Sequence, residues 1–212
     1  GKITNLKKLL DFNTPTNVGI AHTRWATHGE ANVTNAHPHS VGKFTIVHNG
    51  IIENYSELKK SLIKKGYKFK SETDTEVACA VLDDLYKQEK DILKTLNRAT
   101  KIFRGSYALG IICSDDVFTI YALRCTSPLI VATSSDGNFI ASDVPAILKY
   151  TNKYILLDDF EIAKLTQDNI TIYDKDLKEL KKKLNTFAGT FEAAAKNVYE
   201  HFMLKEIHEQ DK

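Results

Sequence analysis

Between residues 106 and 173 the chain alternates short apolar segments with shorter polar ones, and this pattern limits the fold more than any other feature. The apolar segments are SYALGIIC, VFTIYAL, LIVAT, NFIAS, YILL, EIAKL and ITIY, each with the length and side chains of a strand. The connections SDD, SSDGN, DD and TQDN contain the residues of tight hairpins. Because parallel strands need crossovers of a dozen or more residues, connections this short predict antiparallel sheets.

Several of these segments are continuously apolar, which indicates strands that are buried on both faces. Helices should therefore cover the sheets. A chain of 212 residues is long enough for one domain with a substantial core. We predict an α+β fold with two largely antiparallel sheets and no internal repeat.

Helical signals precede most of these strands. In NYSELKKSLIKKG, which starts at Asn54, the residues Tyr55, Leu58 and Leu62 share one helical face and Gly66 can cap the end. The other expected elements are strands over 17–22 and 43–48, a helix over 92–103, a short helix in SDVPAIL with Ser142 as cap and Pro145 in its first turn, and a terminal helix over 190–210.

SETDTEVACAVLDDLY predicts the most strongly marked helix. Thr73 and Glu76 have the spacing of a capping box. Val77, Val81 and Leu85 recur at helical spacing and predict a buried stripe.

Charge and composition argue against several classes of partner. The formal net charge is +2, and the lysines of ELKKSLIKKG and DLKELKKKL alternate with apolar residues, as on solvated helix faces. This indicates no nucleic-acid surface, and we find neither a membrane-spanning run nor a signal-peptide layout. Cys79, Cys113 and Cys125 are scattered and form no CxxC pair, so we expect a reducing, cytoplasmic compartment and small buried thiols.

One polar stretch carries more chemistry than a turn needs. AHTRWATHGE follows the apolar NVGI and combines a guanidinium, the only Trp of the chain, two imidazoles and two hydroxyls. Turns ordinarily use Gly, Asn, Asp and Pro for backbone reasons. The stretch is therefore typical of a receptor for a small polar ligand.

VHNGII allows two interpretations. The Asn49 amide beside the Gly50 backbone N–H has the makeup of an oxyanion hole, whose donors stabilise charge on an attacked carbonyl. Asn-Gly is also the strongest short signal for a type I′ hairpin turn. A helical pattern follows instead of a returning strand, which weakens the hairpin interpretation.

Two charged residues could hold the ends of a free amino acid. Asp74 falls in the first turn of its predicted helix, where the helix dipole alone would favour an acid. The alternative is a carboxylate placed for a ligand ammonium. Arg24 would supply the opposite pole, because its planar fork matches a carboxylate.

The histidines could also suggest a metal. His37 and His39, with His28 or His48, could supply imidazoles, but no carboxylate or cysteine lies at a ligand spacing. We therefore expect no metal and no organic cofactor. No cysteine has a histidine arrangement typical of a nucleophile.

The stretches GIAHTRWATHGEANVTNAHPHS, VHNGIIENYSELKKSLIKKGYKFKSETDTEV, RGSYALGII, SPLIVA, NFIASD and HFMLKEIHEQ occur in this order. Together they closely resemble the glutaminase domain of the glutamine–fructose-6-phosphate amidotransferases, a family of class II glutamine amidotransferases, over nearly the whole chain. TRWATHG, HNGIIEN and SETDTE are specific to this resemblance. Amidotransferases that open purine synthesis share only the Arg and Asn-Gly themes.

The resemblance implies an N-terminal-nucleophile hydrolase sandwich with four layers, αββα, and two antiparallel sheets. It implies that Arg24, with Thr27 and His28, binds the α-carboxylate of glutamine. Asp74 would bind the α-ammonium group.

The same resemblance gives roles to four more residues. Asn49 and Gly50 would form the oxyanion hole. Trp25 would lie near the passage that transfers ammonia to a sugar-phosphate domain, and His37 would neighbour the active site.

The family's nucleophile is a cysteine at the mature N-terminus, whereas GKITNLKKLL resembles a segment several dozen residues further in. We therefore expect residues 1–200 to be an N-terminally shortened glutaminase domain without its nucleophile, inactive alone. HFMLKEIHEQ resembles the junction to an isomerase domain, so residues 201–212 should begin a linker to that missing domain. The expected partners are L-glutamine and this domain, in a homo-oligomeric full-length enzyme, without nucleic acid or membrane.

Three functions remain open at this point. The parent enzyme would hydrolyse L-glutamine and pass ammonia to fructose 6-phosphate, which yields glucosamine 6-phosphate. The chain could instead be a catalytically silent module that binds glutamine or glutamate or docks on a partner. It could also be the glutaminase domain of another class II amidotransferase with a different acceptor, such as a phosphoribosyl group.

Overall fold

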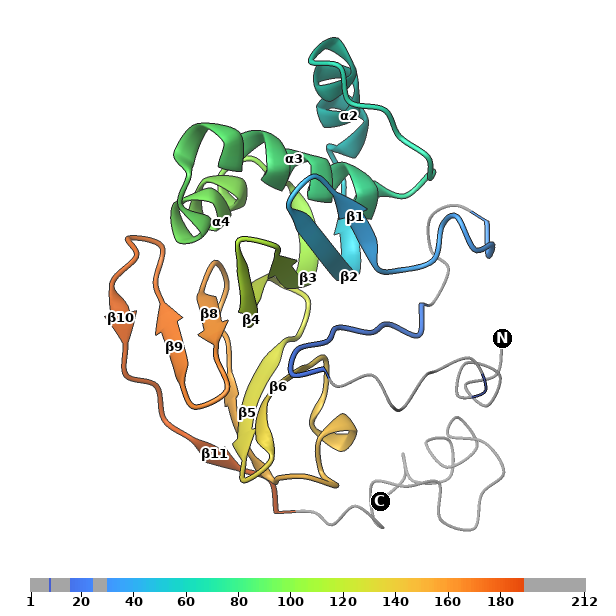
Figure 1. The fold of residues 1–212 in the computed structure, drawn as a ribbon. Helices are drawn as coiled ribbons and strands as arrows, with labels where there is room; N and C mark the ends of the chain where they lie inside the picture. Colours follow the sequence, from blue (N-terminus) through green and yellow to red (C-terminus); the bar gives the residue numbers. More distant parts are fainter. Residues whose placement is uncertain (1–7, 9–15, 25–29, 189–212) are drawn as a thin grey trace, which may run out of the picture.

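The computed structural model describes residues 8, 16–24 and 30–188 of the chain, and Figure 1 shows their arrangement. In chain order the elements are β1 (His39–Val41), β2 (Phe44–Ile52), α2 (Tyr55–Lys64), α3 (Asp74–Glu89), α4 (Ile92–Thr100), β3 (Gly105–Cys113), β4 (Asp116–Cys125), β5 (Ile130–Ser134), β6 (Gly137–Ala141), the 3-10 turn η1 (Val144–Ala146), β7 (Lys153–Leu156), β8 (Ile162–Leu165), β9 (Ile170–Tyr173), β10 (Glu179–Leu180) and β11 (Asn185–Thr186).

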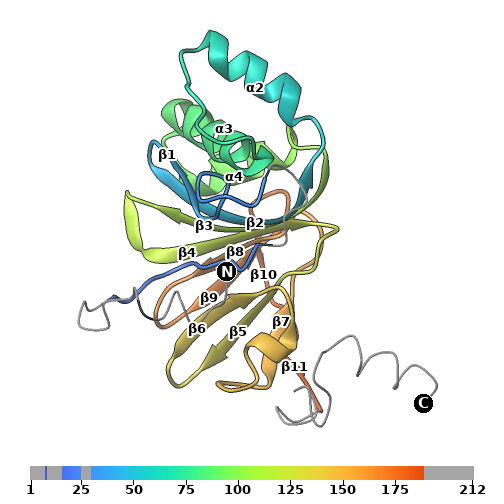
Figure 2. The same cartoon turned by 90° about the vertical axis from the view of Figure 1, so that its right-hand side faces the viewer.

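The strands form two antiparallel sheets, as predicted. A seven-stranded sheet has the order β1-β2-β3-β4-β8-β9-β10, and a four-stranded sheet has the order β11-β7-β5-β6. Figure 2 shows the layers: α3 and α4 lie on one face of the larger sheet, α2 packs on α3, and the smaller sheet faces the other side. The α+β sandwich is confirmed. The terminal helix expected over 190–210 and the linker expected over 201–212 lie outside the described residues.

Two apolar cores hold these layers together. The larger core lies between the helices and the larger sheet and contains the predicted stripe of α3. The second core lies between the sheets, with side chains from β3, β4, β5, β8 and β9. The strands of the larger sheet that lie between both cores are buried on two sides, which explains their continuous apolar sequence.

Three of the four predicted hairpins are confirmed, because β3–β4, β5–β6 and β8–β9 are antiparallel neighbours. The DD hairpin is wrong, since Asp158 and Asp159 lie in the connection from β7 to β8, which belong to different sheets. A turn composition alone does not say whether the next strand continues the same sheet.

Three other local predictions are corrected. No strand forms over 17–22 among the described residues. β2 is already paired on both edges, and Ile20 packs over Gly110 of β3 instead, so the apolar character of this segment reflects packing. The helix expected over 92–103 ends at Thr100. The short helix at SDVPAIL is a single 3-10 turn capped by Asp143, not Ser142.

The start of α3 follows the predicted capping box only in part. Thr73 Oγ1 accepts the N–H of Glu76 at 3.2 Å, as expected. The Glu76 carboxylate turns instead to the N–H groups of Lys70 and Ser71, at 2.9 and 2.6 Å. Although burial has the opposing effect, these hydrogen bonds together outweigh it and lower the pKa of Glu76 below its ordinary value. The carboxylate therefore fixes the loop that leads into α3.

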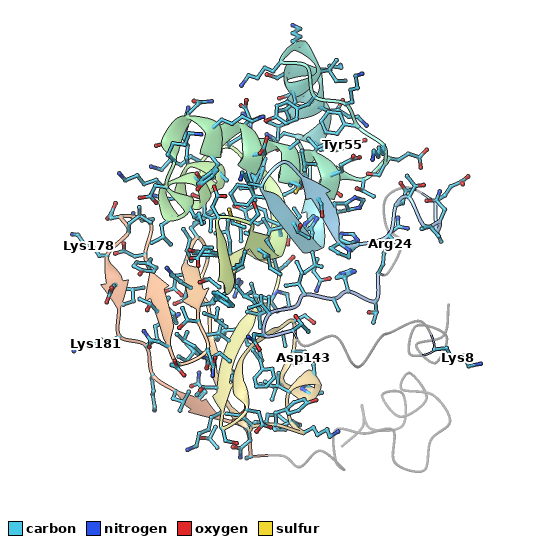
Figure 3. All side chains as sticks on the ribbon, viewed as in Figure 1. Lys8, Arg24, Tyr55, Asp143, Lys178 and Lys181 are labelled. Carbon is cyan, nitrogen blue, oxygen red and sulfur yellow. The ribbon has the colours of Figure 1, made fainter. Side chains whose placement is uncertain are left out.

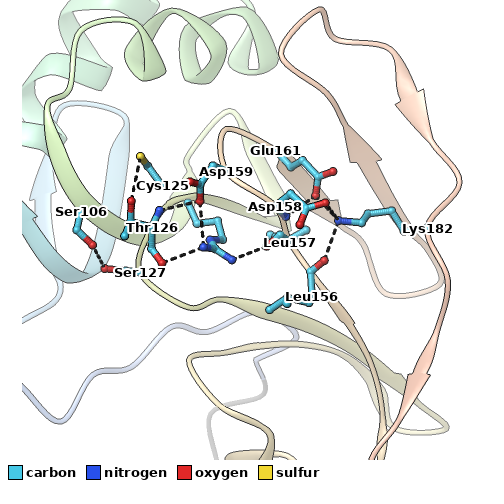
Figure 4. Close-up of polar contacts among 11 residues, drawn as sticks. Ser106, Cys125, Thr126, Ser127, Leu156, Leu157, Asp158, Asp159, Glu161 and Lys182 are labelled. Carbon is cyan, nitrogen blue, oxygen red and sulfur yellow. Dashed lines mark hydrogen bonds and ion pairs between the residues drawn. The ribbon is translucent and has the colours of Figure 1, made fainter.

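A single cation, Arg124, fastens two of the three connections between the sheets, and Figure 4 shows their residues Thr126, Leu157 and Asp159. The Arg124 guanidinium donates to the carbonyl oxygens of Leu157 and Thr126 at 2.6 and 2.8 Å. It also lies 3.0 Å from Asp159 Oδ1, which accepts the N–H of Thr126 at 2.7 Å. Thr126 belongs to the β4–β5 connection and Leu157 to the β7–β8 connection. These charge-assisted hydrogen bonds set the spacing of the two sheets at this corner.

Among the described residues, no helix has both the length and the apolar surface needed to cross a membrane.

Leu82→Ala tests the helix–sheet core, because Leu82 is fully buried in α3. The free energy of unfolding should fall by about 2–5 kcal/mol through lost burial and a residual cavity. Leu184→Ala makes the same change where the side chain is 41% exposed, and should cost less than about 0.5 kcal/mol. Urea unfolding followed by circular dichroism measures both, and equal losses would contradict this core.

Candidate functional site

Five of the site residues predicted from the sequence, His37 among them, line one cavity of about 250 Å³. Arg24 comes from the N-terminal segment, Asn49 and Gly50 from β2, and Asp74 from the start of α3. The wall is completed by His22, His37, His48, Ile51, Thr73 and Thr75. Drug-sized ligands fill pockets of roughly 300–1,000 Å³, so this cavity suits a smaller molecule.

Other hollows are larger but combine fewer kinds of polar group. A cavity of about 560 Å³ is lined by three lysines and two aspartates, but Lys43 pairs with Asp115 and Lys87 with Asp83. A cavity of about 480 Å³ lies against β4, β6 and β8, and Asp136 is its only charged wall residue among the described residues. The 250 Å³ cavity instead combines a guanidinium, a carboxylate, an amide and three imidazoles. Its side chains, more than its size, identify it as the candidate site.

Asn49 and Gly50 lie within β2 and pair with β3, so the type I′ hairpin interpretation is wrong. Gly50 has a φ of +116°, a conformation that favours glycine. A Cβ atom here would lie 2.0 Å from the carbonyl oxygen of Ser106 and 2.9 Å from Ser127 Oγ. The chain can take this course only with glycine, and it places a backbone amide beside the Asn49 side chain.

Asp74 connects the start of α3 to the end of β2. Its Oδ2 accepts the backbone N–H of Ile52 at 2.7 Å, and the residue is 5% exposed. The helix dipole favours a carboxylate at this first helical position, as the sequence suggested. Because Asp74 also lines the cavity, the structural and ligand-binding interpretations are compatible.

Arg24 provides the positive group of the cavity, and Figure 3 shows it on the same flank of the molecule as β1 and β2. Its backbone is left-handed, with φ at +46°. One guanidinium nitrogen donates to the carbonyl oxygen of Glu30 at 2.8 Å, which fixes part of the side chain. The cavity therefore has one wall residue of each charge, as predicted from Arg24 and Asp74.

Two histidines share one hydroxyl beside Asp74. Thr75 Oγ1 lies 2.9 Å from His37 Nε2 and 3.0 Å from His48 Nδ1. Burial lowers the pKa of His48 to about 4, although Asp74 opposes this. Burial, helped by the neighbouring histidines and Arg24, lowers the pKa of His37 to about 3. Both imidazoles are neutral near pH 7, so they add hydrogen-bonding groups but no charge.

Thr75 is a wall residue that the sequence did not single out, and His22 was predicted only as one of the imidazoles of AHTRWATHGE, without a role of its own. His22 Nε2 lies 2.6 Å from Asn49 Oδ1, and Thr75 bridges two imidazoles. The only further sequence signal was their position, two residues before Arg24 and one after Asp74. Trp25, Thr27 and His28 lie outside the described residues, and their expected roles stay predictions.

The three cysteines do not line this cavity. Cys79 and Cys113 are buried, and burial raises the pKa of both thiols, that of Cys79 to about 12. This confirms both as small buried side chains, far from the thiolate form that attacks a carbonyl. The same prediction is wrong for Cys125, which is only half-buried at the end of β4. In the described part of the chain, no three His, Cys, Asp or Glu side chains are placed to hold a metal ion.

Comparison with known proteins adds sequence and fold relationships. Residues 22–149 match the model of a family described as "Glutamine amidotransferase domain". The "glutamine–fructose-6-phosphate aminotransferase [isomerizing]" of Clostridium perfringens is 48% identical over 100% of this chain and 35% of that protein. The protein of the same name from Methanosarcina mazei is 47% identical over 99% of this chain and 36% of its own length. The chain thus spans about a third of the length of these relatives.

Two solved structures have a similar fold. One is a glutamine phosphoribosylpyrophosphate amidotransferase from B. subtilis in complex with ADP and GMP, with a TM-score of 0.60, 20% identity, and coverage of 74% of this chain and 35% of its own. The other is described as the allosteric regulatory enzyme of purine biosynthesis, with a TM-score of 0.60, 21% identity and the same coverage. At this identity the likeness concerns the fold alone.

The lowered pKa of His48 predicts that acid destabilises the fold. Below its ordinary pKa of 6.5 the imidazole takes up a proton in the unfolded chain, whereas the folded one stays neutral down to about 4. The free energy of unfolding should therefore fall as pH decreases through this window. His48→Asn keeps a hydrogen-bonding group but removes this titration. The decrease in the free energy of unfolding between about pH 7.5 and about pH 5 should therefore be smaller by about 1–2 kcal/mol in the variant. Urea unfolding at both pH values measures it, and identical losses would contradict a neutral buried His48.

Proposed function

Because this chain belongs to the class II glutamine amidotransferase family, we propose that its 250 Å³ cavity binds L-glutamine and presents the side-chain amide for hydrolysis. The longer protein would release ammonia and glutamate, then transfer the ammonia to fructose 6-phosphate to give glucosamine 6-phosphate. The names of the relatives support this acceptor.

The observation that carries the proposal is the convergence of Arg24 and Asp74 on one cavity. A free α-amino acid is a zwitterion, with a carboxylate and an ammonium group on the same carbon. Arg24 would hold the carboxylate through its planar fork, and Asp74 would accept hydrogen bonds from the ammonium group. With both groups held, the side chain of the ligand would extend toward Asn49 and Gly50.

Asn49 and Gly50 would stabilise the oxygen of the attacked amide. A carboxamide N–H and a backbone N–H are donors that need no reorganisation when negative charge develops. His37 and His48 are neutral near pH 7, so the stabilisation would come from these uncharged donors. The covalent step requires a nucleophile from outside the described wall of this cavity, as the resemblance to the family implies.

Three further assignments belong to the same proposal. Thr27 and His28 would complete the carboxylate site, and Trp25 would lie near the ammonia passage. Residues 1–200 would form the glutaminase domain, and 201–212 would lead to a sugar-phosphate domain. The full-length protein would be a cytoplasmic homo-oligomer.

A silent glutamine-binding module is the second candidate, because no described cysteine lines the cavity. Calorimetry with L-glutamine and an ammonia assay on the same sample separate the two. Binding with ammonia release supports the enzyme, whereas binding without release supports the module.

Blocking one end of the ligand tests the two poles. L-Glutamine should bind about 10- to 100-fold more tightly than N-acetyl-L-glutamine or L-glutamine α-amide, since each analogue loses one charge-assisted contact. Calorimetry on the unmodified chain measures the three affinities. Equal affinity for all three would contradict a zwitterion site.

Arg24→Ala and Asp74→Asn assign the poles to residues. Arg24→Ala should weaken glutamine about 10- to 100-fold but leave the already weak α-amide nearly unchanged. Asp74→Asn keeps an oxygen that can accept the Ile52 N–H. It should weaken glutamine binding by a similar factor but leave the already weak binding of N-acetyl-L-glutamine nearly unchanged. Arg98→Ala, which breaks an exposed ion pair with Glu89, is the control and should not change binding. If each variant weakened its matching analogue as much as it weakens L-glutamine, the assignment of Arg24 and Asp74 to the two poles would be refuted.

A further inference from the structure

His22 forms a bridge between the two halves of the proposed glutamine site. The backbone N–H of Arg24 donates to His22 Nδ1 at 2.9 Å. On the other side of the ring, His22 Nε2 lies 2.6 Å from Asn49 Oδ1. One imidazole thus touches the residue at the carboxylate pole and the residue proposed for the oxyanion hole.

The protons of this bridge can be assigned by elimination. A backbone N–H only donates, so His22 Nδ1 must accept and carries no proton. A neutral imidazole has one N–H, which must then be on Nε2. Nε2–H therefore donates to the atom 2.6 Å away, and Asn49 Oδ1 accepts.

The two alternative arrangements fail. If the amide were turned over, the Asn49 NH₂ group would face His22 Nε2, and both ring nitrogens would have to accept. That would need an imidazole without any N–H, which protein histidines do not adopt near neutral pH. In a doubly protonated His22 ring, Nδ1–H would point at the N–H of Arg24, so that two donors would face each other without an acceptor.

From these proton positions we propose that His22 is a positioning residue. It fixes which end of the Asn49 side-chain amide, the oxygen or the NH₂ group, faces the ligand. With Oδ1 engaged by His22, the NH₂ group and its two donors remain for a ligand. An unrestrained asparagine could turn its oxygen toward the ligand, where that oxygen would repel a carbonyl oxygen and, more strongly, an oxyanion. The inference rests on the proposed glutamine site, because only a carbonyl-bearing ligand needs those donors.

The bridge also links the carboxylate pole at Arg24 to the Asn49 amide. Arg24 is left-handed, with φ at +46°, and this conformation accompanies the contact of its N–H with His22. The ring of His37 packs against His22, with centroids 4.5 Å apart, and supports its orientation. A change at the carboxylate pole is thereby transmitted to the amide donors without a direct contact between Arg24 and Asn49.

The first experiment reads the tautomer and does not depend on glutamine. Ring ¹⁵N chemical shifts of the ¹⁵N-histidine-labelled chain near pH 7 show which nitrogen carries the proton. The His22 signals are identified by their loss in His22→Phe, which keeps a planar ring without nitrogen. We expect the Nε2–H tautomer. A proton on Nδ1, or a doubly protonated ring, would overturn the proposal.

The second experiment measures coupling between His22 and Asn49 by calorimetry with L-glutamine. His22→Phe should weaken binding about three- to tenfold, the worth of a hydrogen bond to the ligand. His22→Gln, which still donates from the ε position, should recover most of that loss. Thermal unfolding confirms that each variant is folded at the temperature used.

The double variant His22→Phe/Asn49→Ala decides the mechanism. If His22 acts by orienting the amide, the double variant should bind like Asn49→Ala alone. Additive losses, or a His22→Gln as weak as His22→Phe, would overturn the positioning role. If the unmodified chain does not bind glutamine, the proposed function fails, while the tautomer experiment still decides the His22–Asn49 geometry.

Discussion

The site depends first on the hydrogen bond between the Asp74 carboxylate and the backbone N–H of Ile52, at 2.7 Å. This contact joins the first residue of α3 to the last residue of β2, and both lie in the apolar layer between helices and sheet. A buried carboxylate is unfavourable without partners, but the N–H of β2 and the positive end of the helix dipole stabilise it. One charged group therefore positions a helix on a sheet and forms part of the cavity wall.

The electrostatics of the cavity follow from this arrangement. His37 and His48 surround Thr75 and stay neutral, because burial opposes their protonation. Among the described wall residues, the charged side chains are then those of Arg24 and Asp74, and the other polar groups are uncharged donors and acceptors. Under the proposed function, such a cavity would distinguish a zwitterion from an anion or a cation by charge placement, and an amide by the orientation of Asn49.

The sandwich contributes rigidity at a distance from the cavity. Arg124 fastens two of the three connections between the sheets. Ser127, in one of these two connections, lies beside Gly50 and shares a hydrogen bond with Ser106 at 2.6 Å. The backbone of Gly50 thus lies against Ser106 of β3 and Ser127 of the β4–β5 connection. Sites on supported strands hold their geometry more closely than sites on free loops.

Local chemistry in the sequence determined the α+β class, three hairpins, the Thr73 cap, the stripe of α3 and the four residues Arg24, Asn49, Gly50 and Asp74, because turn residues, caps and periodicity act within a few neighbours. Tertiary structure decided the rest. Whether Asn49-Gly50 turns or continues a strand depends on β3 beside it, and DD joins two sheets although its composition is that of a hairpin. The apolar 17–22 segment packs against β3 through Ile20 without forming a strand. His22 and Thr75 became site residues only when β2, α3 and the N-terminal segment met, since a hydrogen bond between residues far apart leaves no spacing for a sequence to display.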